Sequence, residues 1–128
     1  MILLDTDVMI DILRNYPPAI AWLNSLGDQS VGLPGLVAME LIQGCRNAQE
    51  QHRIEAMLAG YTLHWPSEAD CQAAFLDFTR HYLSQNVGLL DALIAGTARG
   101  LGTPLATFNK RHYGVVQSLQ VIEPYVRG

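Results

Sequence analysis

The sequence predicts an α/β fold in which a central parallel sheet of about five short strands is flanked by helices. Apolar runs of strand length alternate with segments of helical periodicity from one end of the chain to the other, an order typical of parallel sheets. Of the 128 residues, 49% are hydrophobic and only 16% are charged, which excludes a disordered chain. No internal repeat or linker divides the sequence, so we expect a single domain spanning residues 1–128.

The first half of the chain contains two strand-like runs, each followed by helical segments. The opening run MILL is too short for a helix, and Thr6 is a favourable N-cap for the helix that follows. Pro17 and Pro18 break that helix and begin the next, which Gly27 terminates. The expected elements are a strand at 1–4, helices at 7–15 and 17–26, a strand at 30–33, a helix at 36–45 and a helical continuation through 47–59.

The second half repeats this alternation. Ser67 and Asp70 form a capping-box variant at the start of the longest helix. The inward-facing candidates of that helix are Ala69, Ala73, Leu76, Tyr82 and Leu83. The expected elements are a strand at 61–65, helices at 67–86 and 89–102, a strand at 103–108, a turn or short helix at 109–114 and a strand at 119–125.

Composition limits the classes of function. No apolar stretch approaches the roughly 18 to 20 residues of a membrane span, and the N-terminus lacks a secretory pattern, so we expect a cytoplasmic protein without membrane contact. The net charge of −4 argues against binding nucleic acid through bulk positive charge but permits an acidic cation site. Cys45 and Cys71 are expected as reduced core thiols, and the scattered histidines argue against a zinc site.

Three aspartates follow the first predicted strand. Asp5 comes directly after the strand, at the edge where open parallel sheets place their functional groups, although capping of the next helix would also explain it. Asp7 lies in the first helical turn, where the helix dipole favours negative charge. Asp11 shares a polar face with Asp7 and Arg14 and is best explained as a solvated surface residue, so we leave it outside the expected site.

Glu40 and Asp91 lie in later helices. Apolar residues surround Glu40 along its helix, and a carboxylate in such surroundings must be paired, protonated or bound to a metal unless its face points outward. Asp91 begins a helix whose next turns carry Ala95 and Ala98, so this face is nearly bare of side chains and another group can come close to it. A favourable interaction with the helix dipole would by itself also explain Asp91. If the sheet brings Asp5 to these two acids, their repulsion favours a hard cation such as Mg²⁺ or Mn²⁺.

Four segments together resemble a known family. They are LLDTDVMID at the start, MELIQG in the middle, DALIAGTARGLGTPLATFN near the end and the closing strand with IEP. In this order and spacing they look like a PIN-domain ribonuclease, and within that superfamily like a VapC-type toxin of a toxin–antitoxin pair. The likeness covers essentially the whole chain and implies the PIN-like three-layer fold.

The resemblance assigns roles to individual residues. The residues that it implies are the catalytic, metal-binding acids Asp5, Glu40 and Asp91 and the supporting hydroxyl residues Thr6 and Thr107. The fourth acidic position of the family falls at Asn109, whose neutral oxygen would hold a second metal more weakly. Asp7 stands where relatives often carry Asn, so its extra charge is a candidate to offset that loss.

The activity implied is endoribonuclease cleavage, the hydrolysis of RNA phosphodiester bonds with Mg²⁺ or Mn²⁺ as cofactor. The segment NKRHY adds candidate RNA contacts. Lys110 and Arg111 would bind phosphates and Tyr113 would stack on a base, unless the segment is an ordinary solvated turn.

The resemblance also implies protein partners. Relatives form homodimers and are inhibited by a small VapB-like antitoxin that covers the acidic pocket. The apolar segments around Trp22 and Leu26, and between Ile54 and Leu58, would supply contact surface for these partners, unless they pack in the core.

Three other functions remain open on the sequence alone. A catalytically impaired PIN-fold module that binds RNA or a partner is supported by Asn109 in place of the fourth acid. A receiver-like phosphorylation switch needs a phosphoacceptor Asp at the end of a central strand and a Lys, usually before Pro, after the last strand. The third predicted strand, in YTLHWPS, ends without Asp, and the sequence contains no Lys-Pro. If the protein were a purely structural subunit without a site, Glu40 would have to face outward by chance, despite its apolar neighbours along the helix.

Overall fold

The computed structural model describes residues 1–127, in which strands and helices alternate along the chain. The strands are β1 (Ile2–Leu4), β2 (Val31–Pro34), β3 (Thr62–His64), β4 (Leu105–Ala106) and β5 (Val121–Ile122). The helices are α1 (Thr6–Leu13), α2 (Pro17–Ser25), α3 (Gly35–Gln43), α4 (Ala48–Leu58), α5 (Glu68–Gln85), α6 (Leu89–Gly100) and α7 (Lys110–Tyr113).

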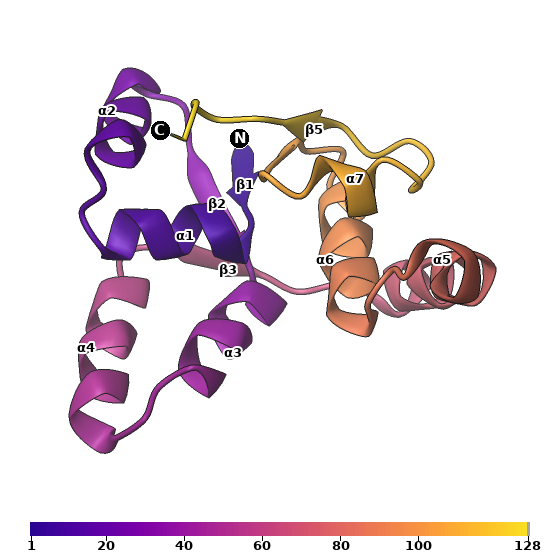
Figure 1. Cartoon of the computed structure of the whole chain (residues 1–128), viewed down its shortest axis with the longest axis horizontal. Helices are drawn as coiled ribbons and strands as arrows, with labels where there is room; N and C mark the ends of the chain where they lie inside the picture. The colour runs from indigo at the N-terminus through magenta and orange to yellow at the C-terminus, as the bar shows by residue number, and fades with distance from the viewer. Residues whose placement is uncertain (128) are drawn as a thin grey trace.

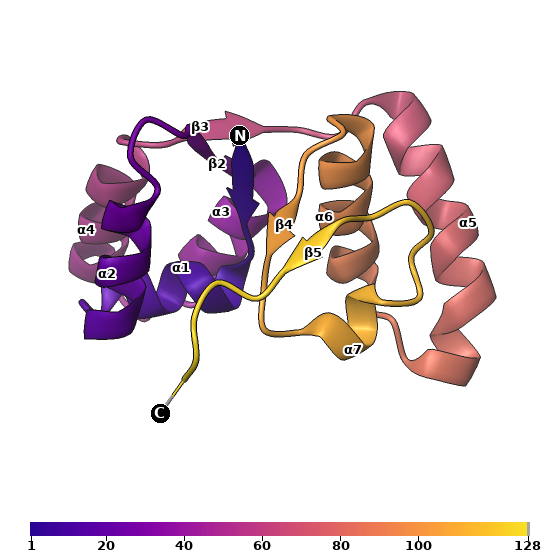
Figure 2. The same cartoon turned by 90° about the horizontal axis from the view of Figure 1, so that it is seen from above.

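The strands form one parallel sheet in the order β3-β2-β1-β4-β5. Strand β1 lies at its centre, with Leu3 in register with Gly32 on one side and Leu105 on the other. All three residues of β1 are buried because helices cover the sheet. Along the long axis of the molecule, α1, α2 and α4 lie to one side of β1, and α5 and α6 lie to the other (Figures 1 and 2). The predicted α/β fold is therefore confirmed.

This strand order determines which loops meet. Because β1 lies between β2 and β4, the segments that leave the carboxyl ends of these three strands are neighbours at one edge of the sheet. Those segments are the start of α1, the start of α3 and the loop that precedes α7. Residues about 100 positions apart in sequence can therefore come into contact, as in other open parallel sheets.

Two predicted helix boundaries were wrong. The residue that caps α1 is Asp5 and not Thr6, since the Asp5 carboxylate accepts a hydrogen bond from the Thr6 backbone N–H and Thr6 is already helical. Residues 36–59 do not form one continuous helix. The chain leaves α3 at Gly44, and Asn47 caps a separate helix, α4, by accepting from the backbone N–H of Glu50.

The inward face of α5 also differs from the prediction. Its buried residues are Ala74 and Asp77, whereas Leu76 and Tyr82 are exposed and Leu83 is 93% exposed. Helix α5 packs chiefly against α6 at the end of the molecule (Figure 2), so only a narrow stripe of it is covered. The capping box of Ser67 and Asp70 is confirmed, with hydrogen bonds in both directions.

The small residues of α6 serve packing. Ala95 and Ala98 are fully buried in the main core, so protein, rather than a ligand, approaches the face that follows Asp91. Cys71 is exposed and Cys45 half-buried, which corrects the expectation that both are core thiols. No helix in the described part of the chain combines the length and the apolar character needed to cross a membrane.

Candidate active site

Asp5 is the most deeply buried carboxylate at the carboxyl edge of the sheet, with 5% of its surface exposed. One oxygen accepts a hydrogen bond from the Thr6 backbone N–H at 2.8 Å, and the other accepts from the Thr107 hydroxyl at 2.7 Å. Burial raises the pKa of Asp5 from 3.8 to about 7; the negative charge of Asp7 adds to this shift, while the two hydrogen bonds oppose it. Because ionising Asp5 is costly, a positive charge nearby would stabilise its carboxylate form strongly.

Asp7 joins α1 to the loop after β4. Its Oδ2 accepts from the Phe108 backbone N–H at 3.0 Å and lies 3.4 Å from the Thr107 hydroxyl, while its Oδ1 accepts from the Val8 backbone N–H at 2.8 Å. Burial raises the pKa of Asp7, and the hydrogen bonds from Phe108 and Val8 oppose that shift. Part of the acceptor capacity of Asp7 is therefore used to hold the loop in place.

Thr107 connects the two aspartates. It is fully buried directly after β4, donates to Asp5, and accepts a hydrogen bond from the Asn109 backbone N–H at 3.0 Å. This chain of contacts positions Asn109 beside the carboxylates. The supporting position that the resemblance assigned to Thr107 is consistent with this geometry.

Glu40 reaches the same place from α3. The Thr6 hydroxyl donates to Glu40 Oε1 at 2.9 Å, and the Glu40 side chain is half-exposed. Glu40 thus avoids the penalty of an isolated charge in an apolar environment, because it has a hydrogen-bond donor and contact with solvent. Thr6 supports the site through its side chain as well as its backbone.

Asp91 approaches from the first turn of α6. The Tyr113 hydroxyl donates to Asp91 Oδ1 at 3.3 Å, and His112 Nδ1 lies 3.5 Å from Asp91 Oδ2. Tyr113 is only 1% exposed, and burial together with the charges of Asp5 and Asp91 raises its pKa far above the usual range. The predicted stacking of Tyr113 on an RNA base is therefore wrong, because its ring is enclosed by protein and its hydroxyl contacts Asp91.

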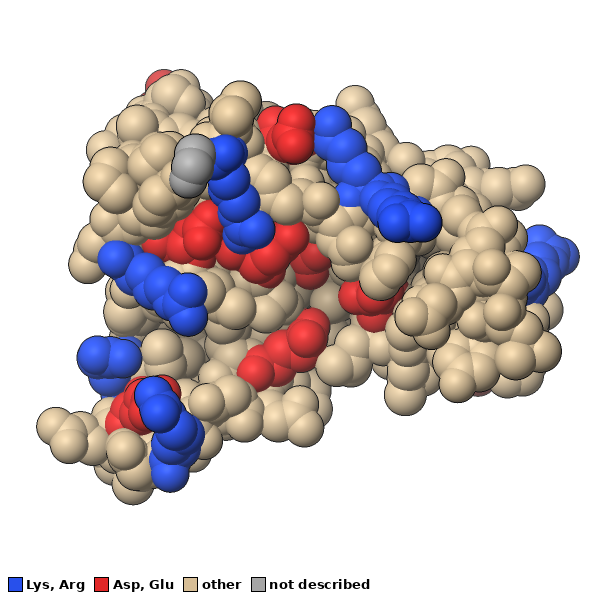
Figure 3. All heavy atoms as spheres, viewed as in Figure 1, with Lys and Arg blue, Asp and Glu red and all other residues tan. Residues whose placement is uncertain are grey.

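These carboxylates line one pocket of about 420 Å³, together with Thr6, Asn109 and Arg127. Figure 3 shows acidic side chains gathered in the hollow centre of this face, with Lys and Arg side chains around them. No three His, Cys, Asp or Glu side chains within residues 1–127 are close enough to enclose a metal by themselves. An open arrangement of carboxylates still fits Mg²⁺, which keeps several waters and uses few protein ligands.

Arg127 is the site residue that sequence reasoning missed. Its Nε donates to Asp11 at 3.1 Å, one Nη donates to the Asp7 backbone carbonyl at 3.3 Å, and its guanidinium lies 4.0 Å from the centre of the Phe108 ring. These contacts place a positive charge at the wall of the acidic pocket. No motif surrounds Arg127, so only the fold could reveal its position.

The basic residues predicted to contact RNA differ in their surroundings. Arg111 is exposed, and Lys110 is exposed but lies 3.6 Å from Glu123. Arg99, a weaker candidate, forms an ion pair with buried Asp77 at 2.8 Å, and therefore holds α6 to α5. The RNA contacts of Lys110 and Arg111 therefore remain predictions.

Comparison with known proteins adds independent information. The family model of the PIN domain matches residues 2–116. The chain is 34% identical to the ribonuclease VapC10 of Mycobacterium tuberculosis, over 94% of this chain and 91% of that protein. It is 26% identical to the tRNA(fMet)-specific endonuclease VapC of Shigella flexneri, over 92% and 93% of the two chains. A solved chain in the VapBC-1 structure from nontypeable Haemophilus influenzae superposes with a TM-score of 0.77 at 27% identity, covering 95% and 97%.

Proposed function

The chain belongs to the PIN-domain family and, within it, to the VapC ribonucleases, and we propose that it is a Mg²⁺- or Mn²⁺-dependent endoribonuclease that acts as the toxin of a toxin–antitoxin pair. The observation that carries this proposal is that Asp5, Glu40 and Asp91, which come from three separate segments of the chain, line one pocket. The RNA phosphodiester bond to be hydrolysed would lie at this pocket.

The residues around the pocket have different roles in this proposal. Asp5, Glu40 and Asp91 would hold the cation, with Asn109 and Asp7 as weaker ligands. A bound divalent cation would lower the pKa of an attacking water molecule and would neutralise negative charge on the phosphate. Thr107 and Thr6 keep Asp5 and Glu40 in position through their hydroxyl groups, and Arg127 would offset negative charge beside the substrate.

The alternative, an impaired PIN-fold module, depends on Asn109. Asn109 Nδ2 lies 3.1 Å from His112 Nδ1, which leaves the amide oxygen available to the pocket as a neutral ligand. Similarity to proteins named as ribonucleases, over most of both chains, favours the active enzyme over this alternative.

The comparisons also guide the choice of substrate and partner. Since one relative is named a tRNA(fMet)-specific endonuclease, transfer RNA is the first substrate to test. Since a structural relative is a chain of a VapBC structure, we propose that a VapB-like antitoxin inhibits the protein by covering the acidic pocket. We propose the cytoplasm as the location of both proteins.

Cleavage assays test the proposed activity. Wild-type protein should cleave RNA in Mg²⁺ or Mn²⁺ and lose activity in EDTA, and Asp91→Asn should reduce kcat by at least about 100-fold, since removing one group that stabilises developing charge commonly costs that much. Asp28→Asn removes an exposed loop carboxylate and should leave cleavage unchanged. Metal-independent cleavage, or full activity of Asp91→Asn, would contradict the proposal.

A further inference from the structure

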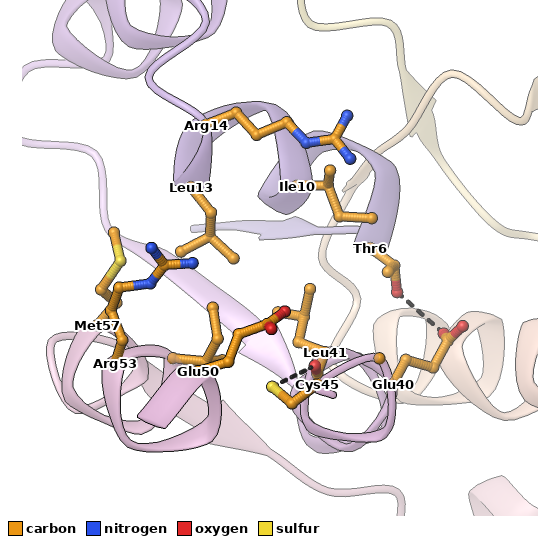
Figure 4. Close-up of a pocket in the computed structure, with 12 residues that line it drawn as sticks. Thr6, Ile10, Leu13, Arg14, Glu40, Leu41, Cys45, Glu50, Arg53 and Met57 are labelled. Atoms are coloured by element: carbon orange, nitrogen blue, oxygen red, sulfur yellow. Dashed lines mark hydrogen bonds between the residues drawn. The ribbon is translucent and has the colours of Figure 1, made fainter. Parts of the chain in front are cut away.

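Beside the acidic pocket, α1, α3 and α4 enclose a second cavity of about 250 Å³, here named the α1–α3–α4 groove (Figure 4). The groove and the acidic pocket have Thr6, Ile10 and Glu40 in common in their walls. The two cavities therefore adjoin each other. The aliphatic residues that line the groove are Ile10, Leu13, Leu41, Ile54 and Met57.

The rim of the groove away from Glu40 carries an excess of positive charge. Arg14 and Arg53 line it, and within residues 1–127 neither forms an ion pair. Arg46 adjoins Arg53 in a neighbouring hollow and lies 3.9 Å from Glu50. At this end of the groove Arg14 and Arg53 thus outnumber the single carboxylate of Glu50. Arg46 adds a third guanidinium group in the adjoining hollow, in a chain whose net charge is −4. Figure 4 shows the guanidinium group of Arg53 directed into the groove.

We propose that the α1–α3–α4 groove binds the nucleotide adjacent to the scissile phosphate of a single-stranded RNA. Its base would pack on the aliphatic floor, as unstacked bases do against apolar side chains. Arg14 and Arg53 would bind the flanking phosphates. The excess positive charge at this end of the groove matches a phosphate backbone. Because the groove adjoins the carboxylate pocket, one RNA strand could occupy both. The inference rests on the proposed ribonuclease function.

Cleavage kinetics test the two arginines. Replacing both, as Arg14→Ala with Arg53→Ala, should raise KM for a single-stranded oligoribonucleotide while kcat changes little. The slope of log(kcat/KM) against log salt should become shallower by about 0.7 for each phosphate that the variant no longer neutralises. Arg80→Ala removes an exposed charge from α5 and is the matched control. An unchanged KM and salt slope in the double variant would overturn the proposal, whereas a wild type that cleaves no RNA would overturn the proposed function itself.

Filling the groove tests the base-binding floor separately. Gly44 lines the groove, and a Cβ added there would meet only backbone oxygen at 3.6 Å or beyond, so Gly44→Leu should fold and occupy the space. We expect a higher KM with an unchanged salt slope, because no charge is removed. Gly60→Leu, whose added Cβ would meet backbone oxygen at 3.6 Å but which does not line the groove, should retain the wild-type KM. Equal KM values for the two variants would refute occupancy of the groove.

Protection of Cys45 tests occupancy directly. Cys45 lines the groove, so in a Cys71→Ser, Asp91→Asn background, saturation with a single-stranded oligoribonucleotide should slow its alkylation by iodoacetamide severalfold. RNA that binds without protecting Cys45 would overturn the proposal. Protection by an antitoxin peptide but not by RNA would do the same, and would assign the groove to the protein partner.

Discussion

At the scale of single residues, Asp5 combines two functions that have opposing requirements. As the N-cap of α1 it is held by the Thr6 backbone, and through Thr107 it is tied to the end of β4. These bonds fix its carboxylate at the pocket, but burial beside Asp7 and Asp91 makes its charged form unfavourable. The proposed cation would offset this cost, and in its absence the buried charge lowers stability.

The raised pKa of Asp5 gives a prediction about pH. Between pH 3.8 and about 7 the folded protein binds more protons at Asp5 than the unfolded chain does, so the contribution of Asp5 to stability is present at low pH and lost as pH rises through 7. In EDTA, Asp5→Asn should raise Tm at pH 8 by several degrees and have little effect at pH 4. Thermal unfolding across this range measures the difference, and an equal effect at both pH values would contradict it.

Thr107 gives a second prediction. Thr107→Val keeps the side-chain shape but removes the hydroxyl that donates to Asp5 and accepts from Asn109. The free energy of unfolding at pH 8 should fall by about 1–3 kcal/mol, because a buried carboxylate loses its donor. Urea denaturation measures this change. Thr107→Ser retains the hydroxyl, and the explanation fails if it is destabilised more than Thr107→Val.

At the scale of elements, the segment after β5 is more important than its lack of regular structure indicates. Tyr125 donates to Asp11 at 2.7 Å, and its ring lies against Tyr16, Trp22 and Phe108. The segment thus connects α1 and α2 to the loop after β4 and carries Arg127 to the acidic pocket. Asp11, expected as a solvated residue near Arg14, is instead the anchor of this segment.

Substitutions at Tyr125 separate its two interactions. Tyr125→Phe removes the hydrogen bond to Asp11 and should lower the free energy of unfolding by about 1 kcal/mol. Tyr125→Ala also removes the ring contacts and should cost about 3 kcal/mol. Because Arg127 would lose its support, the alanine variant should also raise KM for RNA. Equal stabilities of the two variants would show that the ring contacts contribute nothing.

At the scale of the whole molecule, exposed apolar side chains on α5 offer a candidate surface for the predicted homodimer. The segments expected to provide contact surface are largely in the core, as Ile54 and Leu58 are buried and Trp22 and Leu26 pack against it. Phe75, Leu76, Tyr82 and Leu83 of α5 are exposed instead. An apolar helix face of this kind is typical of an interface.

The predicted homodimer can be tested at this surface. Light scattering at micromolar concentration should give the mass of a dimer for the wild type. Leu83→Glu should shift the mass toward that of a monomer, because a charge would be buried at the interface. Leu101→Glu, which changes an exposed leucine outside α5, should remain dimeric. A monomeric wild type would disprove the dimer.

The sequence by itself determined the order of strands and helices, because each strand is a short apolar run and each helix has its own start or stop residue. The positions of Asp5, Glu40 and Asp91 in the predicted elements also made these acids candidates, whereas Thr107 was a candidate only through the resemblance to PIN-domain ribonucleases. The pocket that the three acids share depends on β1 lying between β2 and β4, an arrangement that local periodicity does not encode.

Only the tertiary structure decided which face of each element is covered. Tyr113 proved to be buried, Leu83 exposed, and Arg127 a neighbour of Asp7. These outcomes depend on contacts between residues about 20 to 120 positions apart. Sequence periodicity reflects the secondary structure that a segment prefers locally. Which of its side chains are buried or paired depends on the distant segment that packs against it.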